Sequence, residues 1–431
     1  MINYFIRNLW RIIFNMKLKK KSSGKKIFFG SLIISISVFV IFLINHFHNT
    51  TTEQLSKGEE STQEIAIVAG TPNTDNFTYV ESKDGIQVPV PKRYRASSVE
   101  DELYVNGVTT EEVITDSETG EETTVYTREH SGGFVIYEGE DEVPEDESGL
   151  FETQKTRNQY VWVPISSEEL VNMYHTSNNL LYGNYYNFTA TGYSLTKSGT
   201  REPALLSRYD KDNTYLKQYM YGITQSQFIG EMRQKFYEML KSSATYGGFY
   251  IGRYETGNLS KNVPVVRKMN TDIASQNWYR MYQRCKELSG GNGAVETNMI
   301  WGIQWDETLK WLIDDGEKTA PEIAADSTSW GNYYISTFTY KNTSGGTSTK
   351  NMSNSTKIPT GSADYTKANN IYDLAGNVWD WTMESGGVNF RYCHGGFYSY
   401  DGYDSPAHNR YYDSPLNSYT SIGCRAVLYI K

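Results

Sequence analysis

The segment that decides the fold is NNIYDLAGNVWDWTMES, residues 369–385. Its two aspartates, Asp373 and Asp380, stand on either side of a Gly-Asn pair that is typical of a tight turn. Two carboxylates combined with turn carbonyls form the oxygen ligand set that Ca²⁺ prefers. The alternative is an Asx-type turn, in which the carboxylates accept backbone N–H groups while Trp379 and Trp381 pack in the core. The residues support both interpretations equally.

The surrounding chain predicts a mixed α+β domain with few helices and much irregular structure. Short alternating runs such as ETTVYTRE, GGFVIYEGE and NQYVWVPIS are typical of strands in hairpins. Apolar residues at three-to-four-residue steps predict helices over 223–244, 275–291 and 305–315. Residues 327–362 are rich in Ser, Thr, Asn and Gly, which indicates long loops.

The segment LAGNVWDW, with Tyr372 before it and a Gly-Gly pair and GCRAV after it, resembles the formylglycine-generating (sulfatase-modifying factor) family. The corresponding family segments are YxxxGNxWEW, RGGSW and GFR. GFYIGRYETGN (248–258), NQYVWVPI (158–165) and WYRMYQRCKELSGG (278–291) resemble three further family segments in the same order. The resemblance covers residues 86–431. It implies a C-type-lectin-like fold.

The resemblance also implies a calcium site. Its ligands are the side chains of Asp373 and Asp380 and the carbonyls of Gly376 and Val378. The pair of cysteines that binds copper in the family is replaced by residues near Tyr400 and Ser405, so no copper is expected. The sequence leaves open whether Cys285 and Cys424 form a disulfide.

The segment RYCHGGFYSYDGYDSPAHNRYYDSPLNSYTSIGCR, residues 391–425, contains seven tyrosines in 35 residues. On the implied fold it lies on the ligand-facing surface, where Tyr offers a large amphipathic contact area at low entropic cost. It resembles the variable region of proteins that are diversified by retroelements; the alternative is an ordinary polar loop set. The predicted contact residues within 391–422 are Tyr392, His394, Tyr398, Tyr400, Tyr403, Asp404, His408, Asn409, Tyr411, Tyr412, Asp413, Asn417 and Tyr419.

The N-terminal part of the chain predicts a membrane anchor. Residues 1–26 hold eight of the 41 basic residues and no acid, which leaves 33 basic against 50 acidic residues, a net charge of −17, in the remainder. The next eighteen residues carry no charge and as a helix cover roughly 27 Å, close to a hydrocarbon core. We therefore expect a basic cytoplasmic leader (1–26), a transmembrane anchor (27–47), a polar stalk (48–85) and an extracellular domain (86–431). The acidic remainder argues against nucleic acid as a partner.

Two functions follow as hypotheses. The first is a single-pass cell-membrane protein that binds an unknown protein or glycan outside the cell through its tyrosine-rich segment, with or without diversification. The second is a formylglycine-generating-type, metal-dependent oxidase or protein-modifying enzyme. No GxSxG, Walker or GxGxxG motif is present, and no two of the six histidines have HxxxH or HExxH spacing. The sequence therefore favours binding over catalysis.

Overall fold

The computed structural model describes most of the chain after residue 64. The described residues are 65–115, 119, 122–197, 201–202, 213–220, 222–258, 263–272, 274–387 and 389–431. The predicted leader and anchor, and the first part of the predicted stalk, lie outside them. Among the described residues, none of the helices is both long and apolar enough to cross a lipid bilayer.

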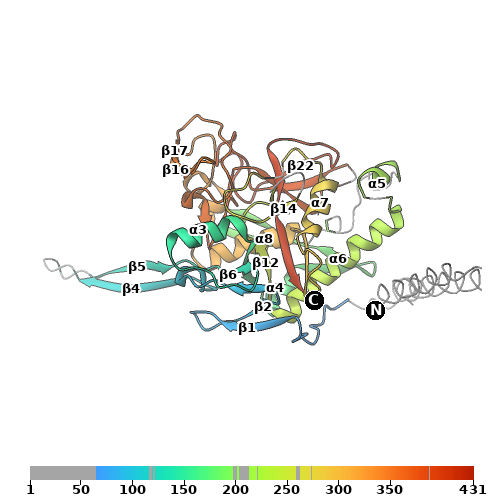
Figure 1. Ribbon diagram of the computed structural model, residues 1–431, viewed down its shortest axis with the longest axis horizontal. Coiled ribbons are helices and arrows are strands. Elements are labelled where there is room, and N and C mark those ends of the chain that lie inside the picture. The colour runs from blue at the N-terminus through green and yellow to red at the C-terminus, as the bar shows by residue number, and fades with distance from the viewer. Residues whose placement is uncertain are drawn as a thin grey trace, which may run out of the picture. The chain divides into compact units, whose positions relative to one another are not determined.

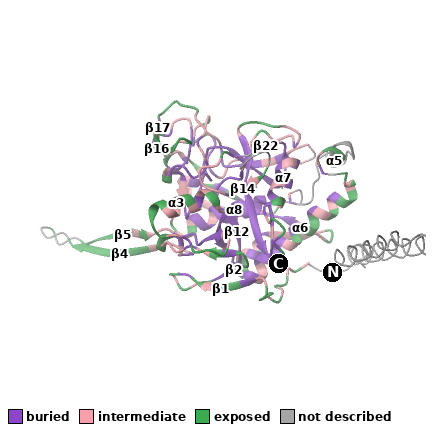
Figure 2. Cartoon of the chain, viewed as in Figure 1, coloured by how far each residue is buried: buried purple, intermediate pink, exposed green. Residues whose placement is uncertain are grey.

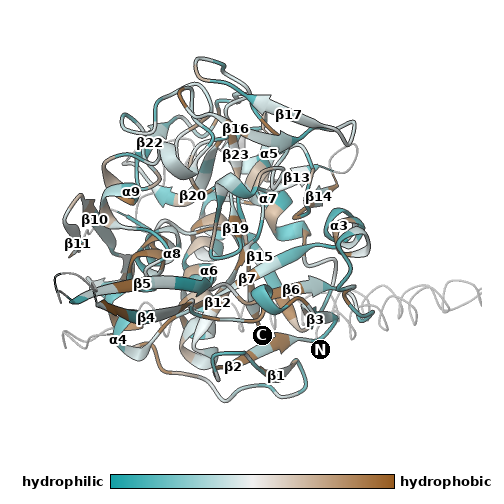
Figure 3. Cartoon of the chain, turned by 90° about the vertical axis from the view of Figure 1, so that its left-hand side faces the viewer, coloured by the Kyte–Doolittle hydropathy of each residue, from teal (hydrophilic) through white to brown (hydrophobic). Residues whose placement is uncertain are grey.

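The centre of the domain is a six-stranded sheet in which every neighbouring pair is antiparallel. Its strands in spatial order are β15 (Val295–Met299), β24 (Ala426–Ile430), β12 (Gly248–Gly252), β7 (Gln159–Pro164), β6 (Val135–Glu138) and β3 (Tyr94–Ala96). All residues of β12 and β24 are buried. Both faces of these central strands are therefore covered, and Figure 3 shows hydrophobic residues gathered around β12 and α6.

Helices cover this sheet and confirm the amphipathic patterns of the sequence. Helix α6 (Gln225–Tyr246) packs on β12 and β24, begins with a capping box at Thr224 and ends at Gly247, whose φ of 78° suits a helix C-terminus. Its predicted apolar stripe is buried. The other α-helices among the described residues are α3 (Glu147–Thr156), α4 (Ser167–Asn172), α5 (Asn213–Tyr219), α7 (Trp278–Glu287), α8 (Gly302–Asp314) and α9 (Ala320–Ala324).

A smaller four-stranded sheet is formed by one strand of segment 369–385 and three strands of segment 391–425. Its order is β22 (Arg410–Asp413), β21 (Arg391–His394), β20 (Trp379–Ser385) and β23 (Ile422–Cys424). Strand β20 pairs in parallel with β23 and antiparallel with β21, which in turn pairs antiparallel with the edge strand β22. The chain between β21 and β22 is irregular, as expected.

Two-stranded hairpins complete the domain, and Figure 1 shows several of them at its periphery. Strand β1 (Phe77–Glu81) pairs with β2 (Gln87–Pro91) and lies inside the predicted stalk, so ordered structure begins before residue 86. The other pairs are β4 (Val108–Thr115) with β5 (Glu122–His130), β8 (Tyr174–Ser177) with β9 (Leu180–Gly183), β10 (Tyr185–Thr189) with β11 (Gly192–Thr196), β13 (Gly257–Asn258) with β14 (Pro264–Val265), β16 (Phe338–Lys341) with β17 (Thr347–Lys350), and β18 (Lys367–Ala368) with β19 (Ile371–Tyr372). The predicted α+β class with much irregular structure is confirmed.

Candidate ligand-binding surface

The turn before β20 is fixed by a buried network of hydrogen bonds. Asn377 donates from Nδ2 to Glu255 Oε2 at 2.6 Å, and the backbone N–H of Val378 donates to Glu255 Oε1 at 3.2 Å. Gly376 has a φ of 75°, and a Cβ at this position would collide with the backbone of Asn332. Only glycine therefore fits at this point of the turn.

The two predicted calcium ligands with carboxylates are already engaged by other groups. Asp373 Oδ1 accepts from Thr366 Oγ1 at 2.7 Å, and Oδ2 accepts from Thr360 Oγ1 at 2.8 Å and from the N–H of Gly361 at 2.9 Å. Asp380 Oδ2 accepts from Arg425 Nε at 3.1 Å.

These contacts are those of a hydrogen-bonded turn, although Asp380 Oδ1 is buried without a hydrogen-bond partner among the described residues. A guanidinium already supplies the positive charge beside Asp380, and both oxygens of Asp373 face donors. In the part of the chain that the structure describes, no group of three or more His, Cys, Asp or Glu side chains is placed to hold a metal ion. Burial raises the pKa of Asp373 and of Asp380, as expected for carboxyl groups inside a packed turn. Calcium binding remains an untested prediction.

By exposure, the predicted contact residues form an exposed group and a half-buried group, and His394 alone is buried. Five tyrosines, with exposed fractions from 45% to 56%, reach the solvent: Tyr400, Tyr403, Tyr411, Tyr412 and Tyr419. Asp404 is also exposed. A second group is half-buried: Tyr392, Tyr398, His408, Asn409, Asp413 and Asn417. We call the seven tyrosines of both groups the tyrosine surface.

The tyrosine surface is backed by stacked aromatic rings. The ring of Tyr411 stacks on buried Trp379 with centroids 5.6 Å apart and an interplanar angle of 28°. The ring centroids of Trp379 and Phe397 are 6.5 Å apart, and those of Phe397 and Tyr400 are 4.5 Å apart. On the other side Tyr412 lies 6.2 Å from the ring of Tyr392, its cross-strand partner. Other aromatic rings of the domain therefore support Tyr400, Tyr411 and Tyr412.

Backbone hydrogen bonds fix the irregular loop that carries Tyr398, Tyr400 and Tyr403. The N–H of Tyr398 donates to the carbonyl of Asn377 in the turn, and the carbonyl of Tyr400 accepts from the N–H of Tyr334 at 2.9 Å. The carbonyl of Gly402 accepts from the N–H of Ser327. A loop held in this way loses little further entropy when its side chains contact a partner.

His394 does not belong to the exposed set. It is completely buried, with Nε2 3.2 Å from Glu384 Oε2 and its ring 5.5 Å from Trp305. The reason is that β21 is an inner strand, covered by Trp305 of α8. Burial, and after it the nearby Arg410, lower the pKa of His394 well below its ordinary value. The prediction that His394 contacts a ligand is not supported by its position.

Beneath the surface, His394 joins a network of charged side chains that the sequence did not reveal. Arg410 forms ion pairs with Glu384, at 3.2 Å, and with Asp306 of α8. Arg201 pairs with Glu384 and lies over the ring of Tyr185 at 3.9 Å. No local pattern relates these residues, because they come from four distant segments.

The arginines of segment 391–425 all point inward. Arg391 lies over the ring of Trp278 at 4.4 Å, Arg410 is paired as described, and Arg425 is completely buried. Around the tyrosines Asp404 is exposed and Asp401 and Asp413 are partly buried, while the partly buried Arg410 is paired with acidic groups beneath. The tyrosine surface is therefore mildly acidic.

The three cysteines are buried. Cys393 Sγ donates to the carbonyl of Tyr411 at 3.5 Å, and burial raises its pKa well above the ordinary thiol value. The sulfurs of Cys285 and Cys424 lie 3.5 Å apart as thiols. Nucleophilic or metal-binding chemistry needs thiolates, and this environment disfavours them.

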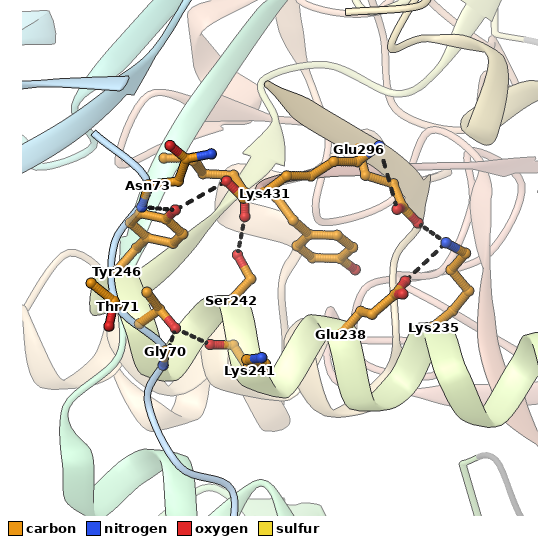
Figure 4. Close-up of a pocket in the computed structure, with 13 residues that line it drawn as sticks. Gly70, Thr71, Asn73, Lys235, Glu238, Lys241, Ser242, Tyr246, Glu296 and Lys431 are labelled. Atoms are coloured by element: carbon orange, nitrogen blue, oxygen red, sulfur yellow. Dashed lines mark hydrogen bonds and ion pairs between the residues drawn. The ribbon is translucent and has the colours of Figure 1, made fainter. Parts of the chain in front are cut away.

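A pocket of about 570 Å³ lies elsewhere, between residues 70–73, helix α6 and the end of β24 (Figure 4). None of the predicted contact residues lines it. Several of its polar groups bond one another: the N–H of Gly70 donates to Thr245 Oγ1 at 2.8 Å, and Lys235 bridges Glu238 and Glu296 at 2.9 and 2.7 Å. The first contact fastens residue 70 to α6, and Lys235 joins α6 to β15.

Comparison with known proteins gives matches in solved structures only. No protein-family model matches the chain, and no curated protein matches it. Three solved structures are similar over 43% of this chain: CarF (15% identity, 87% of its chain, TM-score 0.28), PvdO from Pseudomonas aeruginosa (14%, 82%, 0.29) and Treponema denticola variable protein 1 (15%, 85%, 0.26). Because these TM-scores are below 0.5, the function is argued from the residues alone.

Proposed function

We propose that this protein is a membrane-anchored, extracellular binding protein of C-type-lectin-like fold that contacts a protein or glycan through the tyrosine surface. The observation that carries the proposal is the exposure of five tyrosines, at 45% to 56%, two of which contact an aromatic ring beneath them: Tyr411 lies against Trp379 and Tyr400 against Phe397. Tyr side chains bury a large area on contact and lose little entropy, which is why binding loops use them. The anchor rests on the uncharged segment 27–47.

The division between exposed and buried positions also supports diversification by a retroelement. Gly395, Gly396, Ser405 and Ala407 are buried and hold the loop in place, while the neighbouring tyrosines face solvent. Exposed side chains of this kind can be exchanged at little cost in stability, because surface substitutions usually change it by less than about 0.5 kcal/mol. A near-copy of the DNA for 391–425 that differs only at adenines, beside a reverse-transcriptase gene, would establish this step; a genome without such a copy leaves a binder of fixed specificity.

The binding proposal is tested on the full chain in lipid nanodiscs. Ligands are selected from a glycan array and a displayed-peptide library, and each is then measured against a quadruple variant, Tyr400→Ala, Tyr403→Ala, Tyr411→Ala and Tyr412→Ala. We expect affinity to fall by at least about a hundredfold, because exposed aromatic anchors dominate such interfaces. The melting temperature should stay close to that of the native protein.

The matched control replaces two tyrosines that are exposed elsewhere, Tyr79→Ala and Tyr237→Ala, at 49% and 36% exposure. This variant should bind every selected ligand with native affinity. If all ligands bind the quadruple variant as tightly as the native protein, the tyrosine surface is not the binding site.

A further inference from the structure

The hairpin of β4 (Val108–Thr115) and β5 (Glu122–His130) extends from the domain as a two-stranded ribbon (Figures 1 and 2). In the described part of the chain no third strand pairs with it, so the outer edges of both strands offer backbone N–H and C=O groups. Residues 109–115 and 122–127 are all exposed. A two-stranded ribbon without further packing is marginally stable in water.

Both faces of this ribbon carry apolar side chains. The pairing register places Glu111 opposite Tyr126 and Val113 opposite Thr124, so that Val113 and Tyr126 are diagonal neighbours on one face. Since alternate residues point to opposite faces, Ile114 and Val125 are diagonal neighbours on the other. All four side chains are exposed, at fractions from 38% for Val125 to 67% for Tyr126.

The base of the hairpin is firmly attached. Arg128 forms ion pairs with Asp315 and, at 2.9 Å, with Glu317 at the end of α8. The N–H of Gly107 also donates to Asp315 Oδ1 at 2.8 Å. On the other side His130 stacks on Tyr104 with centroids 4.5 Å apart. The base of the hairpin is fixed, while its apolar faces and its backbone edges are exposed. The hairpin is therefore suited to contact a partner.

The charges of the hairpin indicate which partner fits. Glu111, Glu112, Glu122 and Glu129 are exposed on its two strands, whereas Arg128 is already neutralised at the base. A second copy of the hairpin would bring like charges together, and an anionic lipid surface would be repelled in the same way.

We infer that the β4–β5 hairpin is a docking edge for an extended segment of a partner protein, in which basic and apolar residues alternate. The segment adds as a third strand, so that backbone hydrogen bonds supply affinity and alternate side chains supply specificity. Its apolar residues cover Val113 and Tyr126 or Ile114 and Val125, and its basic residues lie beside the glutamates. This surface is separate from the tyrosine surface.

The probe is a short, end-capped, fluorescent peptide of alternating lysine and valine, added to the full protein in nanodiscs made of uncharged lipid. Binding is followed by fluorescence anisotropy. We expect saturable binding that weakens with salt. A glutamate–valine peptide should not bind, and a lysine–valine peptide N-methylated at alternate residues should lose at least about tenfold in affinity, because it cannot complete the backbone ladder.

Two variants locate the binding. A quadruple threonine variant keeps strand propensity but removes the apolar area, and should weaken binding at least about tenfold. It combines Val113→Thr, Ile114→Thr, Val125→Thr and Tyr126→Thr. Glu111→Lys, Glu112→Lys and Glu122→Lys together should reverse the preference toward the glutamate–valine peptide. Tyr79→Thr, at 49% exposure on strand β1, is the matched control and should change nothing.

The remaining outcomes decide against the inference. Equal binding of both peptides, or binding that survives the threonine variant, excludes the hairpin as a basic-segment site. Sedimentation that shows a dimer dependent on Val113 and Tyr126 assigns the edge to a second copy, and binding to anionic vesicles assigns it to lipid. The quadruple variant of the tyrosine surface should still bind the peptide, which keeps this result distinct from failure of the proposed function.

Discussion

Arg425 Nε lies 3.1 Å from Asp380 Oδ2, and both side chains are completely buried. The same guanidinium donates to the carbonyls of Gly252, at 3.0 Å, and of Tyr372 and Asp373, at 2.9 and 3.1 Å. One arginine thus joins the central sheet, the 369–385 turn and strand β20. The GCRAV motif therefore has a structural role that its place near the tyrosines did not indicate.

Replacing Arg425 should strongly destabilise the domain. Arg425→Met leaves the Asp380 carboxylate buried without its partner, which costs about 3–5 kcal/mol of unfolding free energy. The double variant Arg425→Met, Asp380→Leu should cost clearly less than the sum of the single variants. Urea unfolding measures the free energy of unfolding of the native protein, of each single variant and of the double variant. Strictly additive effects would show that the two groups do not interact.

Calcium distinguishes the two interpretations of the 369–385 turn. If Asp373 and Asp380 serve as hydrogen-bonded turn residues, the melting temperature should be the same with millimolar calcium, with a chelator and with neither. A ligand that binds only the folded state would raise it. A calcium-dependent rise that disappears in Asp373→Asn would instead establish the calcium site.

Gly376 should be intolerant of any side chain. Gly376→Ala combines an unfavourable positive φ with a collision against the backbone of Asn332, and should cost several kcal/mol. Gly345, with a φ of 83° and open space around it, is the matched control. Gly345→Ala should cost only about 1 kcal/mol. Equal losses in unfolding free energy would mean that the close approach to Asn332 is unimportant.

Acid should destabilise the protein through His394. The unfolded state binds a proton at this residue below about pH 6.5, whereas the folded state, in which the pKa is lowered, does not. The contribution of His394 to the free energy of unfolding is therefore fully present above that pH. It falls as the pH is lowered, by up to about 1.4 kcal/mol per pH unit. Burial also lowers the pKa of His408, which adds to the slope.

The variant His394→Gln should reduce this slope between pH 6.5 and 5, measured by urea unfolding at each pH. Met352→Leu, at an exposed position without a titratable group, is the control and should retain the native slope. An unchanged slope in His394→Gln would show that another group is responsible for the loss of stability in acid.

The cysteines should be unreactive in the folded protein. Burial raises the pKa of Cys393 and of Cys424, so the thiolate that alkylating reagents attack is scarce. Iodoacetamide at pH 7.5 should modify them slowly in buffer and rapidly in urea, as mass spectrometry of the digested protein will show. Rapid modification of Cys393 without denaturant would reopen the case for a reactive thiol near the tyrosine surface.

Local patterns were enough to predict the helices α6, α7 and α8 and the exposed tyrosines, whereas α3, α4, α5 and α9 were not predicted. Phe228, Met232 and Phe236 repeat at helical spacing, and all three are buried on α6. Tyr400 and Tyr403 lie between turn-forming residues, which the chain places at the surface, and both are exposed.

Long-range partners could not be predicted in the same way. His394 stands among polar residues, but its burial depends on Trp305, which lies far away in the sequence. Arg201 and Glu384 pair across an even larger separation and share no motif. Strand β1 was assigned to the stalk because its mostly exposed residues give only a weak strand pattern.

The position of β24 has a consequence for the order of folding. This strand, Ala426–Ile430, lies between β12 and β15 in the six-stranded sheet, although it follows all the other described strands in the sequence. Until residue 430 has been made, β12 lacks one neighbour and β15 has no partner strand. The domain must therefore wait for nearly all of its chain before its sheet can close, and such dependence on distant contacts makes folding slow. A ribosome-stalled chain that ends near residue 425 should remain sensitive to protease.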